Sequence, residues 1–189
     1  MKKYLIFLVV LLLAVTIFSV GLAQEISEDV QAKIDNAMSA APLAIAQDAT
    51  IIDADVDENG DFIILREGTN DWTCMPALPF TPGNDPACFD NMWMEWNVAL
   101  FAGRDPVITA PGLSYMLQGG SDASNIDPFI MEPAEGEDWV ISGPHVMLIF
   151  PEPLDTTYFT TDHTSGLPYI MWAGTPFEHI MMPVASGEE

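Results

Sequence analysis

The chain has 189 residues, of which 28 are Asp or Glu and only 5 are Lys or Arg, so its formal charge is −23. Five cationic side chains are too few to neutralise a run of phosphates, which excludes nucleic-acid binding. They are also too few to bind an anionic membrane surface electrostatically. Hydrophobic residues make up 49% of the chain, with five Trp and ten Phe, which supplies a packed core and excludes a disordered protein.

Residues 1–23 have the pattern of a secretory signal peptide. Lys2 and Lys3 form its positive start, residues 4–20 are almost wholly apolar, and Gly21-Leu22-Ala23 offers a cleavage site. We therefore expect a secreted or periplasmic protein with no membrane attachment after cleavage. An uncleaved anchor is the alternative, although the apolar run is about as short as a membrane span can be.

The two cysteines, Cys74 and Cys88, predict a disulfide. An exported protein folds in an oxidising compartment, where such pairs are oxidised. The bond would close a loop of about 15 residues and stabilise the fold by about 3 kcal/mol in the chain-entropy model. A metal or redox pair is the alternative, but the spacing is far from C-x-x-C.

Residues 24–48 are expected to form a helical segment ahead of the main domain. Ser27 can cap the helix, and apolar residues recur every four positions from Ile26 to Met38. Pro42 then interrupts the pattern. The apolar stripe is narrow, so we expect this helix on the surface of the domain.

Residues 49–189 are expected to form a single β-rich domain with the disulfide loop 74–88. Apolar runs at 49–56 and 62–66 flank Asn59-Gly60, a strong hairpin signal. A second helix is predicted over residues 90–102, and Gly103 is placed to end it.

The C-terminal half consists of short apolar runs separated by Pro, Gly and Asp-Pro. This pattern favours a mainly β fold, an antiparallel sandwich or barrel with an N-terminal helix and one further helix; an α+β fold is the alternative. The expected strands are 107–109, 113–117, 139–141, 145–150, 157–160, 169–173 and 179–184.

A repeated His-x-Met motif is the most suggestive chemical pattern. His145 and Met147 lie two apart in one expected strand, and His179 and Met181 lie two apart in another, so each pair shares a face. Two imidazoles and two thioethers would suit Cu(I) if the strands are neighbours. The motif resembles the end of the signature of periplasmic copper chaperones, whose other spacings are not reproduced. The alternative assigns the histidines to backbone hydrogen bonds and the methionines to the core.

An acidic segment offers a weaker calcium candidate. Asp55, Asp57, Asn59, Gly60 and Asp61 match the first half of an EF-hand loop. The second half fails, because Arg66 occupies the position of the bidentate Glu. An acidic hairpin tip is the alternative.

Catalytic motifs are sparse. No G-x-S-x-G, S-x-x-K or H-E-x-x-H motif occurs. A secreted hydrolase would have to use a histidine or acid in loop 119–127 or loop 162–166. The first loop holds Ser121 and Ser124, and the second begins with Asp162-His163. Both segments also read as polar turns.

Only three cations remain after signal removal: Lys33, Arg66 and Arg104. We expect each arginine to bind a carboxylate, with anion binding as the alternative. Self-repulsion among the acids favours a monomer.

Several sequence blocks are distinctive together, and the chain is similar over residues 49–184 to a group of secreted bacterial proteins of unknown function. The resemblance implies no activity. Its blocks are Glu67 to Cys74, Gly83 to Pro86, Tyr115 to Gly120, Ala123 to Pro128, Gly143 to His145 and Tyr169 to Phe177.

These observations favour an exported acidic protein that binds a ligand, with copper as the first candidate and calcium as a weaker one. A hydrolase is the second hypothesis. A surface structural protein with an exported protein partner is the third.

Overall fold

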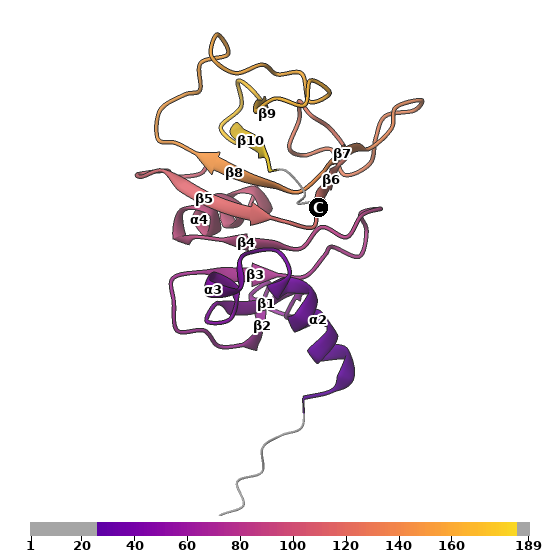
Figure 1. Cartoon of the computed structure of the whole chain (residues 1–189), viewed down its shortest axis with the longest axis vertical. Coiled ribbons are helices and arrows are strands. Elements are labelled where there is room, and N and C mark those ends of the chain that lie inside the picture. The colour runs from indigo at the N-terminus through magenta and orange to yellow at the C-terminus, as the bar shows by residue number, and fades with distance from the viewer. Residues whose placement is uncertain (1–25, 185–189) are drawn as a thin grey trace, which may run out of the picture.

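A computed structural model describes residues 26–184, so the predicted signal peptide lies outside the described part of the chain. Within it, eight strands form one sheet in the order β2-β1-β3-β4-β5-β8-β10-β9, and β6 and β7 form a separate pair (Figure 1). Only β1 and β3 are parallel; every other neighbouring pair is antiparallel. The predicted β-rich fold is confirmed. The sheet is open, however, so the predicted barrel or sandwich is not confirmed.

The described elements comprise three helices and ten strands. They are α2 (Glu28–Met38), α3 (Leu43–Ala46), β1 (Thr50–Val56), β2 (Phe62–Arg66), β3 (Thr73–Met75), β4 (Ala87–Phe89), α4 (Asn91–Phe101), β5 (Gly112–Met116), β6 (Gly120–Asp122), β7 (Val140–Ser142), β8 (His145–Ile149), β9 (Tyr169–Met171) and β10 (His179–Pro183).

Both predicted long helices begin at a side-chain cap, at the predicted Ser27 and at Asp90. Ser27 Oγ accepts a hydrogen bond from Val30 N, and Asp90 Oδ1 accepts one from Trp93 N. Asp90 Oδ2 also accepts from Leu113 N at 2.6 Å, which ties the start of α4 to β5. Gly103 follows α4 with a φ of 63°, the left-handed conformation that ends a helix.

The helices pack on opposite faces of the sheet, because adjacent residues of a strand point to opposite sides. Ile51 and Cys74 pack in one cluster with α2 and α3, whereas their neighbours Ile52 and Met75 pack in another with Trp93 of α4. The predicted N-terminal helix is therefore joined by a short third helix, and α4 alone covers the second face.

The hairpin between β1 and β2 is confirmed, but the strand prediction was wrong elsewhere. Residues 107–109 form no strand, and residues 157–160 contribute only a bridge between Thr160 and Tyr169. Conversely, β6 lies in a segment that we predicted as a polar loop. Three-residue strands such as β3, β4 and β6 carry too few alternating positions to be recognised from periodicity.

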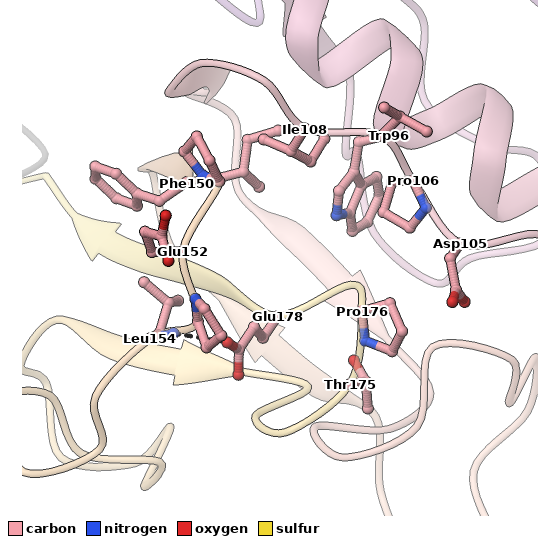
Figure 2. Close-up of a pocket in the computed structure, with 14 residues that line it drawn as sticks. Trp96, Asp105, Pro106, Ile108, Phe150, Glu152, Leu154, Thr175, Pro176 and Glu178 are labelled. Atoms are coloured by element: carbon pink, nitrogen blue, oxygen red, sulfur yellow. Dashed lines mark hydrogen bonds between the residues drawn. The ribbon is translucent and has the colours of Figure 1, made fainter.

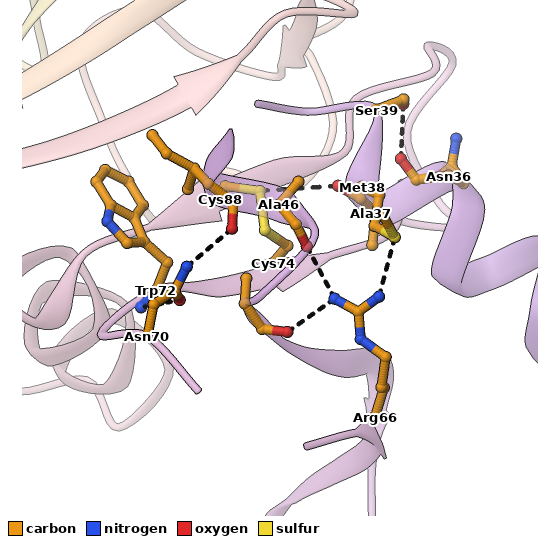
Figure 3. The surroundings of a disulfide bond; sticks show 12 residues. Asn36, Ala37, Met38, Ser39, Ala46, Arg66, Asn70, Trp72, Cys74 and Cys88 are labelled. Carbon is orange, nitrogen blue, oxygen red and sulfur yellow. Dashed lines mark hydrogen bonds between the residues drawn. A yellow bond between two sulfur atoms is a disulfide. The ribbon is translucent and has the colours of Figure 1, made fainter. Parts of the chain in front are cut away.

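The predicted disulfide is confirmed, and it links the paired strands β3 and β4 (Figure 3). Cys74 and Cys88 are fully buried under α2. Arg66 supports the same region, because its Nη2 donates to the carbonyl oxygens of Ala46 and Ala49 at 2.8 and 2.9 Å. The expectation that Arg66 binds a carboxylate was therefore wrong: its guanidinium satisfies carbonyl groups at the end of α3 and the start of β1.

Candidate functional site

A cavity of about 160 Å³ lies between α4 and the sheet, and a wider space of about 310 Å³ lies against it and shares part of its wall. We call them the inner cavity and the outer cavity. The inner cavity is lined by apolar side chains and by a small polar set consisting of Asp85, Asn97, Ser121, Asp122, His145 and His179.

Both histidines of the His-x-Met motifs line the inner cavity. His145 and His179 are each 2% exposed. His145 Nδ1 lies 2.7 Å from the Gly143 carbonyl oxygen, and His179 Nδ1 lies 3.0 Å from that of Phe177. A carbonyl can only accept, so Nδ1 carries the proton and Nε2 keeps a lone pair. Burial lowers the pKa of both imidazoles, that of His179 to about 4.

Three indoles enclose His179. Its ring centroid lies 5.5, 5.6 and 5.1 Å from those of Trp93, Trp96 and Trp172, each in an edge-to-face arrangement. Tryptophans from α4 and from the turn after β9 thus fix a neutral imidazole between them.

The two His-x-Met strands are neighbours, as the copper hypothesis required. Met147 and Met181 are direct cross-strand partners, so all four predicted ligands share the buried face under α4. His145, however, is opposite Pro183, which is four residues from His179. Because a strand rises about 3.3 Å per residue, the imidazoles start about 13 Å apart along the strands. The geometry therefore brings together two thioethers and places one histidine on each side of them.

Two carboxylates share the inner cavity wall. Asp85 is 6% exposed, and its Oδ1 accepts from Leu78 N while its Oδ2 accepts from Ser121 Oγ. Burial, and to a smaller extent the charge of Asp85, raises the pKa of Asp122 to about 7. Within residues 26–184, no protein donor hydrogen-bonds the carboxylate of Asp122.

The cations of the described chain are engaged elsewhere. Lys33 Nζ lies 2.8 Å from Asp53 Oδ2, and Arg104 binds both oxygens of Glu95, as expected for one arginine. Arg66 binds carbonyl oxygens. None of the three lines either cavity. Within this part of the chain, Asp85 and Asp122 therefore have no Lys or Arg as a counter-ion.

Four residues of the inner cavity carry a buried nitrogen that no protein atom hydrogen-bonds: Trp93 Nε1, Trp96 Nε1, Asn97 Nδ2 and His145 Nε2. Buried polar atoms are nearly always partnered in folded proteins. Their concentration around one cavity makes it a candidate binding site.

The outer cavity has an apolar rim. Phe80, Phe101, Phe129 and Met131 line it and are each more than half exposed. Large exposed apolar residues gathered around an opening mark a binding surface more often than an ordinary protein surface.

A separate groove of about 440 Å³ also has Trp96 in its wall (Figure 2). Its walls include Pro106 and Pro176, and its acids include Glu178. Glu178 is already satisfied, because its two oxygens accept from Leu154 N at 2.7 Å and from Gly174 N at 2.8 Å. The inner cavity, with unsatisfied polar atoms, is the better candidate site.

The acidic hairpin uses its side chains to build the turn. Asp57 Oδ1 accepts from the backbone N of Asn59 and of Asp61, and these hydrogen bonds lower the pKa of Asp57. Across residues 26–184, no group of three or more His, Cys, Asp or Glu is placed to hold a metal ion. The predicted calcium ligands Asp55, Asp57, Asn59 and Asp61 therefore form no cluster of this kind.

Of the two loops proposed for a hydrolase, one lines the cavities and the other does not. Loop 119–127 reaches the cavities through Ser121 and Asp122, and its Ser124 Oγ accepts from the backbone N of Ile126 and of Asp127, as in the turn alternative. Loop 162–166 lines neither cavity, and the Asp162 carboxylate accepts from Thr164. Within the described chain, Ser121 hydrogen-bonds an aspartate and no histidine.

The sequence did not indicate that Asp85, Trp93 and Asn97 line a cavity. Asp85 lies in the proline-rich disulfide loop, where nothing local distinguishes it from other acids. Asp122 was inside a predicted loop but had no assigned role. A buried acid can be recognised only when its neighbours in space are known.

Comparison with family models, with curated proteins and with solved structures found no match. No helix within residues 26–184 is both long and apolar enough to cross a bilayer. The function must therefore be argued from the cavities themselves.

Proposed function

We propose that this chain is an exported binding protein that holds a small amphipathic organic molecule in the joined cavities under α4. The observation that carries the proposal is the lining of the inner cavity, where four buried nitrogens lack a partner and two carboxylates are present. Ligand sites are typically concave and mostly apolar, with a few convergent polar groups.

The two cavities differ in the chemistry of their lining residues. The inner cavity supplies polar atoms and two neutral imidazoles, whereas the outer cavity supplies Phe129, Met131 and Trp139. A ligand with a polar head and an apolar body matches this division. Binding without catalysis is the simplest function, because Ser121 has no histidine partner in the described chain.

A neutral fluorescent probe, N-phenyl-1-naphthylamine, tests the proposal. We expect one probe to bind per chain and to quench tryptophan emission, because indoles line both cavities. Ala123→Phe, which fills the outer cavity, should weaken binding at least tenfold, or about 1.4 kcal/mol. Ala134→Phe is the matched control at an exposed position outside both cavities. Unsaturable binding, or equal effects of the two variants, would contradict the proposal.

A second candidate function is Cu(I) binding, favoured by the direct pairing of Met147 with Met181. Thioethers and imidazole nitrogens are soft ligands suited to Cu(I). The backbone bonds that fix His145 and His179 leave Nε2 free, as in many metal-bound imidazoles. Because the two imidazoles start about 13 Å apart along the strands, one ion would bind both thioethers and only one imidazole.

Competition with a chromophoric Cu(I) chelator tests the copper candidate. We expect one Cu(I) per chain and at least a tenfold loss of affinity in Met181→Leu, which keeps the side-chain size. Met182→Leu is the control, because Met182 pairs with Val146 and points to the other face. A chelator that retains all its copper, or equal losses in both variants, would exclude this site.

A further inference from the structure

We propose that the polar head of the bound molecule is a protonated amine, which lies in the inner cavity against Asp85 and Asp122. This inference rests on the proposed function and names the chemical class of its ligand. Four features of the described chain carry it: the charge balance of the cavity, its acceptor atoms, its indole rings and the overall charge.

The charge balance of the inner cavity is incomplete without a cation. Asp85 is buried and holds two neutral donors, Leu78 N and Ser121 Oγ, neither of which compensates a full charge. Asp122 faces the same space with no protein donor among the described residues. Buried charges in proteins are paired or lose their charge. An ammonium group would supply the missing counter-charge to both.

The inner cavity holds unpartnered acceptors as well as the unpartnered N–H donors of Trp93, Trp96 and Asn97. Besides the two carboxylates, His145 Nε2 is an acceptor with no partner, and that histidine is 2% exposed. The tautomer of His179 leaves its Nε2 as a further acceptor. An ammonium group donates up to three hydrogen bonds and accepts none, so it can satisfy the acceptors of this set, which an ionised carboxylate or phosphate group cannot.

The aromatic wall favours the same head group. Trp93 and Trp172 line the inner cavity, and indole rings attract cations more strongly than other aromatic side chains do. The formal charge of −23 also concentrates cations near the surface and repels anions. The rim of Phe80, Phe101 and Phe129 then receives the apolar body of the amine.

Three unbranched probes of eight carbons each separate the head groups: octylamine, octan-1-ol and octanoate. We expect octylamine to bind the purified protein at least tenfold more tightly than octanol at 150 mM salt, and octanoate to bind more weakly than both. Asp122→Asn should lower octylamine affinity at least tenfold and lower the preference for octylamine over octanol. Asp105→Asn is the control, because Asp105 is exposed and lines the groove beyond Trp96.

Three other outcomes would contradict the proposal in different ways. If octanol and octylamine bind equally, the head group is not recognised as a cation, but the binding function stands. If none of the three binds and the naphthylamine probe also fails, the proposed function itself is wrong. If Asp105→Asn lowers the preference for octylamine as much as Asp122→Asn does, overall charge explains the preference, and the proposed site is wrong. Near-ultraviolet circular dichroism of each variant establishes that its tryptophans remain packed.

Discussion

Removing the disulfide in the double variant Cys74→Ala, Cys88→Ala is expected to lower the free energy of unfolding by about 3 kcal/mol. A cross-link over 14 positions restricts the unfolded chain, and the chain-entropy model gives about this value for a loop of that size. Both sulfurs are also fully buried under α2, so their loss leaves unfilled space in that cluster.

Urea unfolding followed by tryptophan emission measures this change. Reductant should lower the stability of the wild type by about 3 kcal/mol. The reduced wild type should stay slightly more stable than the double variant, because it keeps the two buried sulfurs. The double variant should not respond to reductant. That comparison separates the cross-link from the loss of the side chains. A difference smaller than about 1 kcal/mol would mean that β3 and β4 hold their register without the bond.

Replacing Asp122 by Asn is expected to stabilise the protein at neutral pH by up to about 4 kcal/mol. In the folded state the pKa of Asp122 is about 7, whereas its ordinary value is 3.8. Between these values the folded state binds more protons than the unfolded state. The free energy of unfolding of the wild type therefore falls as pH rises through this window, at 1.36 kcal/mol per pKa unit. Asparagine does not ionise, so Asp122→Asn avoids this loss of stability.

His179 produces the opposite slope. Its folded pKa of about 4 lies below its ordinary value of 6.5, because burial disfavours the imidazolium ion. Between pH 4 and 6.5 the unfolded state binds more protons, so stability rises with pH by about 3 kcal/mol. In the wild type the slopes from His179 and Asp122 oppose each other. In Asp122→Asn the rise due to His179 becomes visible.

Chemical denaturation from pH 4 to pH 8 checks the prediction. The difference in stability between Asp122→Asn and the wild type should be near zero at pH 4, grow through pH 5 to 7 and then stay constant. Asp138→Asn is the control, because Asp138 is exposed and lines neither cavity. A difference that does not change with pH would show that Asp122 is ionised in the folded protein throughout.

Features encoded over a few residues were predictable from the sequence. The cap at Ser27, the hairpin at Asn59-Gly60 and the end of α4 at Gly103 all depend on local backbone chemistry. The disulfide followed from the number of cysteines and the expected compartment. The adjacency of the His-x-Met strands was stated as a condition of the copper hypothesis, and the pairing of β8 with β10 meets that condition.

What only the tertiary structure decided is the site. Asp85 comes from the disulfide loop, Asp122 from β6 and the imidazoles from β8 and β10, and Ser121 and Asp85 are 36 positions apart along the chain. The identity of each residue was visible in the sequence, but which acids lose contact with water was not. Burial depends on where the whole sheet places α4, and the pKa, the missing counter-ion and the unpartnered nitrogens all follow from that burial.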